Sequence, residues 1–322
     1  MPLPTVVILD KHQPGWKAAK QRALMRTTST RVSLWNALSN VAINVAEIIP
    51  VAYDTEDTVV YPMSYNYRIE PLLLRRLEIL ADALGMRVIA VDTPGITMDF
   101  NAPERTRPTR MPVRTILEVS KGNFRTLASI QMEAVRQTTG IPDTSWRLLG
   151  ESLGAQMVSA MSLTARCISL DIVEPVNLNR LSLNQLIRLG QLLAETEEVR
   201  RRDLIKINED AGWGYFPPFE DSSELHSRAD AHFKRFSKQG WWALVSALGL
   251  RSGLASTFIS LPRVRHIGLW RGKDSSVSCG SVHTLEDQLA GLDAQVNEFE
   301  LVGGEIPAGQ HILTSFVKCR VW

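Results

Sequence analysis

The chain has 322 residues, of which 44% are hydrophobic and 22% are charged. This composition is not that of a disordered protein. The length is sufficient for one large globular domain, or for a core domain with a smaller inserted one. Lysine and arginine outnumber aspartate and glutamate by only 36 to 34, and the basic residues are spread along the chain. We therefore expect no nucleic-acid partner, because such a partner requires a concentrated basic surface.

The N-terminal region lacks the features of an export signal. Residues 1–10 have no basic segment and no small-residue cleavage site, and no later stretch has 18 uninterrupted apolar residues, so we expect a cytoplasmic chain without a membrane span. Three cysteines without CxxC or CxxH spacing fit a reducing compartment and predict neither a disulfide framework nor a metal site. Apolar residues at helical spacing predict helices over Gly15–Met25 and Ser33–Val45.

Alternating strands and helices follow. Short β-branched or apolar runs predict strands, and longer stretches with apolar residues at helical spacing predict helices. The predicted strands are Glu47–Tyr53, Thr58–Met63, Met86–Asp92 and Trp146–Gly150, and the predicted helices are Pro71–Leu84 and Ser120–Thr139. This alternation is typical of parallel strands joined by helices, so the predicted fold class is α/β, with a mostly parallel central sheet flanked by helices.

Beyond residue 177 and until about residue 260, the chain lacks the short β-branched or apolar runs that predict strands. The predicted elements are then helices over Leu181–Ile207 and Ser223–Leu250, a strand over Val264–Trp270, a helix over His283–Leu292 and a strand around Glu298–Val302. We therefore predict an α/β core formed by residues 1–177 and 260–322, and an inserted α-helical cap formed by residues 178–259. A cap at this point would lie over the carboxyl ends of the strands, where such folds bind ligands.

The most informative segment is a G-x-S-x-G sequence, Gly150–Gly154, between a predicted strand and a helix-forming run. A nucleophilic serine needs this setting, because small residues on both sides permit the tight strand-to-helix turn that exposes the Ser152 hydroxyl. The helix N-terminus would place the Leu153 backbone N–H where a developing oxyanion could use it. The alternative is an ordinary turn in which Ser152 caps the helix.

A serine nucleophile needs a histidine to remove its proton and an acid to orient that histidine. His311 follows a strand-like run near the C-terminus, and Asp274 lies in the turn after a predicted strand, so the chain order is nucleophile, acid, histidine. Glu174 is an alternative acid, and Asp274 could instead be an ordinary turn residue. No cofactor is predicted.

The chain resembles the α/β-hydrolase superfamily over nearly its whole length after about residue 47. The similar segments are Gly150–Gly154, the strand and D-x-P-G turn of Arg87–Gly95, the acid-bearing loop Trp270–Asp274 and the histidine loop Gly309–His311. The resemblance implies a catalytic triad of Ser152, Asp274 and His311, with the helical cap shaping the substrate pocket.

Two features depart from the family pattern. Many members carry His-Gly after the third strand, next to the residue that supplies the second oxyanion N–H, but the corresponding stretch Tyr61–Asn66 has no His-Gly. A backbone donor needs no particular side chain, so Ser64 or Tyr65 could supply this N–H, the side chain of Tyr65 or Asn66 could donate instead, or the hole could be poor. Ala155 replaces a glycine of many members, which a helix tolerates.

The resemblance implies a serine hydrolase that cleaves an ester, a thioester or an activated amide of a small molecule through an acyl-enzyme. Serine at position 152 argues against the dehalogenase and epoxide-hydrolase branches, which use a carboxylate nucleophile. Trp213, Trp241 and Trp242 in the predicted cap suggest an apolar group on the acyl substrate, or else anchor the cap. Acyl transfer or carbon–carbon bond hydrolysis on the same triad, a non-catalytic binding role and a homo-oligomeric state stay open.

Overall fold

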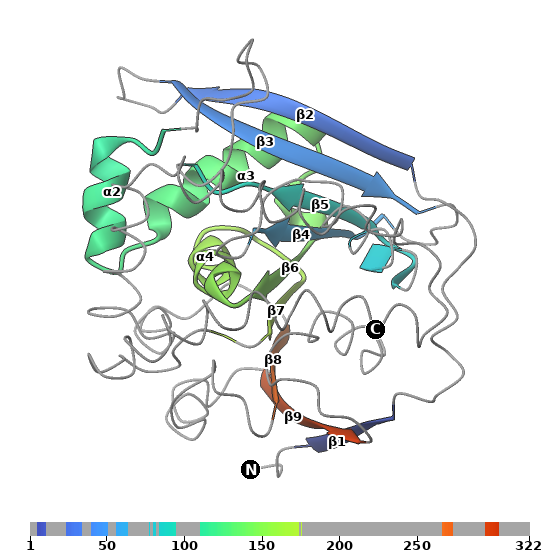
Figure 1. Ribbon diagram of the computed structural model, residues 1–322. Coiled ribbons are helices and arrows are strands. Elements are labelled where there is room, and N and C mark those ends of the chain that lie inside the picture. Colours follow the sequence, from blue (N-terminus) through green and yellow to red (C-terminus); the bar gives the residue numbers. More distant parts are fainter. Residues whose placement is uncertain are drawn as a thin grey trace, which may run out of the picture.

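The computed structural model of the chain (Figure 1) describes residues 5–10, 24–33, 40–50, 56–63, 77, 80–81, 84–94, 110–173, 175, 266–272 and 294–302. Its elements are, in chain order, β1 (Thr5–Asp10), β2 (Leu24–Ser33), β3 (Asn40–Ile49), β4 (Thr58–Pro62), β5 (Arg87–Val91), α2 (Val113–Ser120), α3 (Arg125–Thr139), the 3-10 turn η2 (Asp143–Ser145), β6 (Trp146–Glu151), α4 (Leu153–Ser162), β7 (Ser169–Val173), β8 (His266–Gly272) and β9 (Ala294–Val302).

These strands form one sheet in the order β1-β9-β8-β7-β6-β4-β5-β3-β2. β3 is antiparallel to both of its neighbours, β2 and β5, and the other neighbouring pairs in the described sheet are parallel. Helices α3 and α4 lie against one face of this sheet, and α2 packs on α3 (Figure 1). The predicted fold class, a mostly parallel sheet flanked by helices, is therefore confirmed.

The hydrophobic core lies between these helices and the sheet. Successive side chains of a strand point to opposite faces, so Val41, Ile43 and Val45 of β3 all face the helices. Leu148 of β6 and Ile172 of β7 belong to the same buried cluster. Removal of this apolar surface from water is the main force that holds the helices on the sheet.

Helix α4 lies in the interior, and all ten of its residues are buried. Its serine hydroxyls are satisfied inside the helix, since Ser159 Oγ donates to the Ala155 carbonyl at 2.7 Å and Ser162 Oγ donates to the Ser159 carbonyl at 2.8 Å. The turn between β6 and α4 therefore leads into a helix that is buried on all sides.

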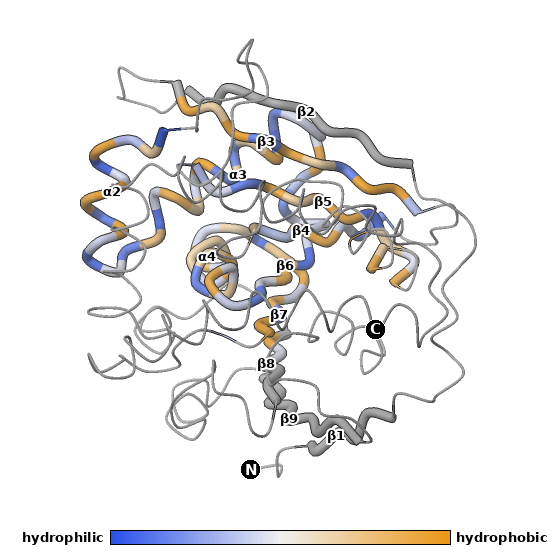
Figure 2. The backbone as a smooth tube through the Cα atoms, in the orientation of Figure 1, coloured by the Kyte–Doolittle hydropathy of each residue, from blue (hydrophilic) through white to orange (hydrophobic). Residues whose placement is uncertain are grey.

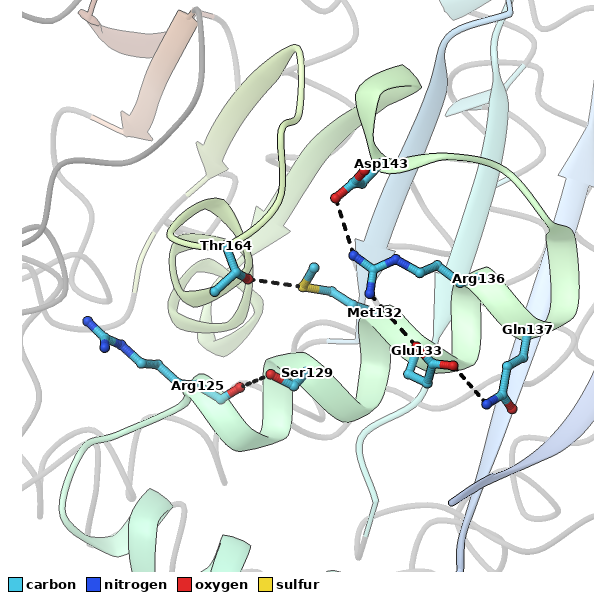
Figure 3. A network of polar contacts seen from close by, with 8 residues as sticks. All are labelled: Arg125, Ser129, Met132, Glu133, Arg136, Gln137, Asp143 and Thr164. Carbon is cyan, nitrogen blue, oxygen red and sulfur yellow. Dashed lines mark hydrogen bonds and ion pairs between the residues drawn. The ribbon is translucent and has the colours of Figure 1, made fainter. Parts of the chain in front are cut away.

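Polar contacts of α3 hold the amino end of β6 (Figure 3). Arg136 Nη2 donates to Asp143 Oδ2 at 3.2 Å, and Arg136 Nη1 lies 3.8 Å from Glu133 Oε2. The guanidinium carbon of Arg136 also lies 5.6 Å from the centre of the Trp146 ring, a cation–π arrangement. Because Trp146 is buried and begins β6, these contacts anchor the strand that leads to Ser152.

Several predicted strands are confirmed. β4, β5 and β6 match their predictions within one residue at each end. β8 corresponds to the strand predicted over Val264–Trp270, and β9 includes the predicted Glu298–Val302 but begins earlier, at Ala294. Leu77, Leu80, Ala81 and Leu84 are helical, as the prediction for Pro71–Leu84 requires.

The helices predicted near the N-terminus are wrong where the structure describes them. Leu24 and Met25 lie in β2, and most of the described part of Ser33–Val45 lies in β3. The strand predicted over Glu47–Tyr53 likewise begins earlier, at Asn40. β3 is buried on both faces, so its tube is hydrophobic over most of its length (Figure 2), and this removes the alternation that identifies a half-buried strand.

One helix prediction was too long. The helix predicted over Ser120–Thr139 begins at Arg125, because Gly122 adopts φ +82° and a turn separates α2 from α3. The predicted cap, residues 178–259, and the predicted helix His283–Leu292 lie outside the described residues. Within the described part of the chain, no helix is both long and apolar enough to cross a membrane.

Candidate active site

Ser152 occupies a strained turn between β6 and α4. β6 ends at Glu151 and α4 begins at Leu153, so a single residue makes the change of direction. Ser152 has φ 55° and ψ −118°, and among the described residues it is the one non-glycine residue with positive φ. Such a backbone costs about 1–3 kcal/mol and persists only where the surroundings enforce it.

Two neighbouring elements enforce this turn. On one side, the Ser152 N–H donates to the Val173 carbonyl of β7 at 3.0 Å. On the other, Gly150 lies so close to α4 that a Cβ there would be 2.4 Å from Val158 Cγ2 and 2.5 Å from the Gly154 carbonyl oxygen. Glycine at position 150 is therefore required by the close approach of strand and helix.

The side chain of Ser152 does not act as a helix cap. The residue stands at the N-cap position of α4, but its hydroxyl makes no capping hydrogen bond. Its positive φ also differs from the extended backbone of an ordinary N-cap residue. Leu153 is the first residue of α4, where a backbone N–H has no acceptor within the helix, so this N–H is available at a helix end that favours negative charge.

The turn lies at the topological switch point of the sheet. The chain passes from β4 to β5 on one side and then places β6 on the other side of β4. The last β4–β6 pair is Val60–Leu148, whereas β6 pairs with β7 as far as Glu151–Val173. β4 and β6 therefore separate before their carboxyl ends, and open α/β sheets bind ligands in such a crevice.

A buried hydrogen bond beside Ser152 was missed by the sequence predictions. The Tyr61 hydroxyl of β4 donates to Glu151 Oε2 of β6 at 2.8 Å, and the two residues are 0% and 4% exposed. The available signal was a carboxylate at the end of an otherwise largely apolar strand, since such a group needs a buried donor.

The predicted D-x-P turn is held in place by its neighbours. Asp92 Oδ2 accepts a hydrogen bond from Asn44 Nδ2 at 2.8 Å, and the Asp92 carbonyl accepts one from Gln131 Nε2 at 3.1 Å. The Met63 N–H, in turn, donates to the Val91 carbonyl at 2.9 Å. These contacts fix the carboxyl ends of β4 and β5 on the far side of the crevice from Ser152.

The remaining predicted site residues lie outside the described residues. They are Asp274, His311 and Glu174, and the candidate oxyanion donors Ser64, Tyr65 and Asn66. Their roles stay predictions.

No group of three or more His, Cys, Asp or Glu residues that could hold a metal ion occurs among the described residues. Burial raises the pKa of the Cys167 thiol to about 12, and the nearby Asp143 contributes to this increase. Because the thiolate is the reactive form of cysteine, Cys167 is not a candidate nucleophile near neutral pH.

Comparisons with solved structures find proteins of similar fold. The sequence matches no protein-family model and no curated protein. The structure is similar to an esterase from Exiguobacterium antarcticum, with 17% identity over 90% of this chain and 100% of that chain and a TM-score of 0.53. A probable hydrolytic enzyme from Pseudomonas aeruginosa PAO1 has 16% identity over 98% and 97% of the two chains and a TM-score of 0.52. A thermophilic esterase from Thermogutta terrifontis has 14% identity over 91% and 96% and a TM-score of 0.52.

Proposed function

The chain has the α/β-hydrolase fold, and on this basis we propose that it is a serine hydrolase that cleaves an ester, a thioester or an activated amide of a small molecule. The observation that carries the proposal is the strained backbone of Ser152 at the switch point of the sheet. Strain of this kind concentrates at functional sites. At Ser152 the strained backbone places a hydroxyl that makes no capping hydrogen bond beside the N-terminus of α4, which is the setting that a nucleophile requires.

In the proposed reaction, Ser152 Oγ attacks the carbonyl carbon of the substrate while His311 accepts the hydroxyl proton. Asp274 orients His311 and stabilises its protonated form. His311 then delivers the proton to the leaving group, and a water molecule, activated by the same histidine, hydrolyses the acyl-enzyme and regenerates Ser152.

The negative charge that develops on the carbonyl oxygen needs two donors. The Leu153 N–H is the first of them, since it stands at the start of α4. The second is the N–H of Ser64 or Tyr65, in the stretch that follows β4 along the chain. Donors from the two sides of the β4–β6 crevice would then converge on one oxygen.

Strand order supports the choice of Asp274 and His311. β8 ends at Gly272, shortly before Asp274, and β9 ends at Val302, before the loop that leads to His311. β6 to β9 are parallel, so their carboxyl ends share one edge of the sheet. The segments after β8 and β9 therefore start from the same edge as Ser152.

The substrate specificity that we propose follows from the cap. Residues 178–259 would cover the crevice, and the tryptophans Trp213, Trp241 and Trp242 would contact an apolar acyl group. Three cysteines without disulfide or metal-site spacing support action in a reducing compartment such as the cytoplasm.

Covalent labelling tests the nucleophile. A fluorophosphonate probe followed by peptide mass spectrometry is expected to give an adduct on the Gly150–Gly154 segment of the wild type and none on Ser152→Ala. Ser159→Ala is the matched control, because Ser159 is a buried serine of the same helix and its loss should leave labelling intact. A folded wild type that takes up no label at Ser152 would favour a non-catalytic binding role instead.

Two further variants separate the candidate acids. Loss of the orienting acid is expected to lower kcat by about 10⁴-fold, so Asp274→Asn should show this loss and Glu174→Gln should not. The reverse pattern would assign the role to Glu174. Product analysis with alcohol or amine acceptors present distinguishes hydrolysis from acyl transfer, since only a transferase gives mainly the acylated acceptor.

A further inference from the structure

We propose that the hydrogen bond between Tyr61 and Glu151 positions the Ser152 turn by bridging the two strands that separate at the crevice. The inference rests on the proposed function, because it makes Tyr61 and Glu151 positioning residues for a nucleophilic serine. Neither residue belongs to the predicted triad or to the predicted oxyanion donors.

The bond lies immediately beyond the end of the β4–β6 pairing. Val60–Leu148 is the last pair in the described register, and Tyr61 is the next residue of β4. Glu151 is the last residue of β6. Where pairing of the two main chains stops, the 2.8 Å contact between the Tyr61 hydroxyl and the Glu151 carboxylate continues the connection between the strands.

The register also explains why the two side chains meet. Continued by one residue, it places Tyr61 opposite Leu149, and residues two apart on a strand point to the same face, so Glu151 shares that face. Gly150 lies between Leu149 and Glu151 on the strand, and a Cβ added to it would point toward Val158 of α4. The Tyr61–Glu151 bond therefore holds β6 from the face opposite the helix.

Burial makes the bond hard to exchange for a bond to water. Tyr61 and Glu151 are 0% and 4% exposed, so a broken bond would leave a buried acceptor short of its donor. Together with the Ser152 N–H bond to Val173, the Tyr61 hydroxyl secures the turn from both neighbouring strands.

The functional consequence concerns the oxyanion hole. The two strands that the bond joins lead, along the chain, to the two proposed donors: Leu153 follows β6, and the candidate second donors follow β4. The separation of β4 and β6 therefore sets the position of the Leu153 N–H relative to the carboxyl end of β4. Since a misplacement of about 1 Å can cost about 100-fold in rate, loss of the bridge should slow chemistry more than binding.

The test compares variants that remove the bond with one that keeps it. Tyr61→Phe removes the donor and Glu151→Leu removes the acceptor, so both should lower kcat for a p-nitrophenyl ester, and the rate of fluorophosphonate labelling, by about 10- to 100-fold with KM changed less than about twofold. Glu151→Gln retains a carbonyl oxygen that can accept from Tyr61, and should stay within about threefold of the wild type.

A control variant distinguishes positioning from general loss of stability. Asp57→Asn weakens another contact between the same two strands, at their amino ends, where Arg147 donates to Asp57 Oδ2 at 2.7 and 2.9 Å. It should lower the free energy of unfolding in urea while the folded protein is labelled at the wild-type rate. A labelling rate reduced as much as in Tyr61→Phe would overturn the proposal.

The remaining outcomes also decide it. A wild type that is not labelled at Ser152 overturns the proposed function and the bridge with it. A labelled wild type, with Tyr61→Phe labelled equally fast, overturns the bridge alone. Equal losses in Glu151→Gln and Glu151→Leu also overturn it, because the negative charge rather than the hydrogen bond would then be required. If Tyr61→Phe does not fold, the comparison of these two Glu151 variants decides the question.

Discussion

The substitution Gly150→Ala tests the packing that forces Ser152 into its strained backbone. An added Cβ would lie 2.4 Å from Val158 Cγ2, 2.5 Å from the Gly154 carbonyl oxygen and 2.7 Å from the Gly154 carbonyl carbon. The valine methyl can move by a change of side-chain rotamer, but the Gly154 carbonyl belongs to the first turn of α4 and cannot. Bringing the 2.5 Å contact to 3.0 Å therefore requires a movement of about 0.5 Å between strand and helix.

The cost of this movement sets the expected result. Overpacking in a core costs about 1–3 kcal/mol, and we expect the upper half of this range because the closest fixed atoms are backbone. The movement also displaces Leu153, so the rate of fluorophosphonate labelling should fall by about tenfold or more. Urea unfolding and the labelling rate of the folded protein measure the two effects separately.

Gly140→Ala is the matched control. Gly140 has φ +69° at the end of α3, but a Cβ there would meet nothing within 4 Å. Its alanine variant should lose about 1–2 kcal/mol through backbone strain alone and keep the wild-type labelling rate. If Gly150→Ala unfolded within about 0.5 kcal/mol of the wild type and was labelled equally fast, close packing would not be the cause of the strained turn.

Other predictions follow from the same contacts. Ser152→Gly should exceed Ser152→Ala by about 1 kcal/mol in free energy of unfolding in urea, because glycine adopts φ 55° and ψ −118° with less strain; equal values would refute this. Asp57→Asn should lower the free energy of unfolding by about 1–3 kcal/mol, since Arg147 donates to Asp57 Oδ2 at 2.7 and 2.9 Å. Labelling of Ser152 should persist in this variant, because the Arg147–Asp57 pair lies at the amino ends of β4 and β6. Cys167 should resist iodoacetamide at about pH 9 until the protein unfolds, as its pKa is raised to about 12, and peptide mass spectrometry after native treatment would reveal any contrary alkylation.

The success of the strand predictions depended on local pattern. β4, β5 and β6 are short β-branched or apolar runs that end at turn residues, and such runs carry enough information to locate a strand. β3 failed because both of its faces are buried. Val41, Val45 and Ile48 are then spaced as on one side of a helix, so the local pattern also fits a helix. Only the pairing of this segment with β2 and β5 makes it a strand.

The same distinction applies to the candidate site. The tight turn could be predicted because Gly150, Ser152 and Gly154 are neighbours in the sequence, and the structure shows the strand and helix expected on either side. The bond between Tyr61 and Glu151 joins residues 90 positions apart. It depends on β4 and β6 being neighbours in the sheet and on their register, which a local pattern does not contain.

The complete burial of α4 has a consequence for how the protein loses activity. Helix ends on a surface usually open at a small cost in free energy, long before the rest of the protein unfolds. The first turn of α4 has no such freedom, since Leu153 and its neighbours are enclosed, and the Ala155 N–H is bonded to the Ser152 carbonyl at 3.2 Å. The bonded amide hydrogens of this turn, such as that of Ala155, should therefore exchange with solvent only when the whole core opens. On heating, the geometry around Ser152 and the fold itself should disappear in a single step.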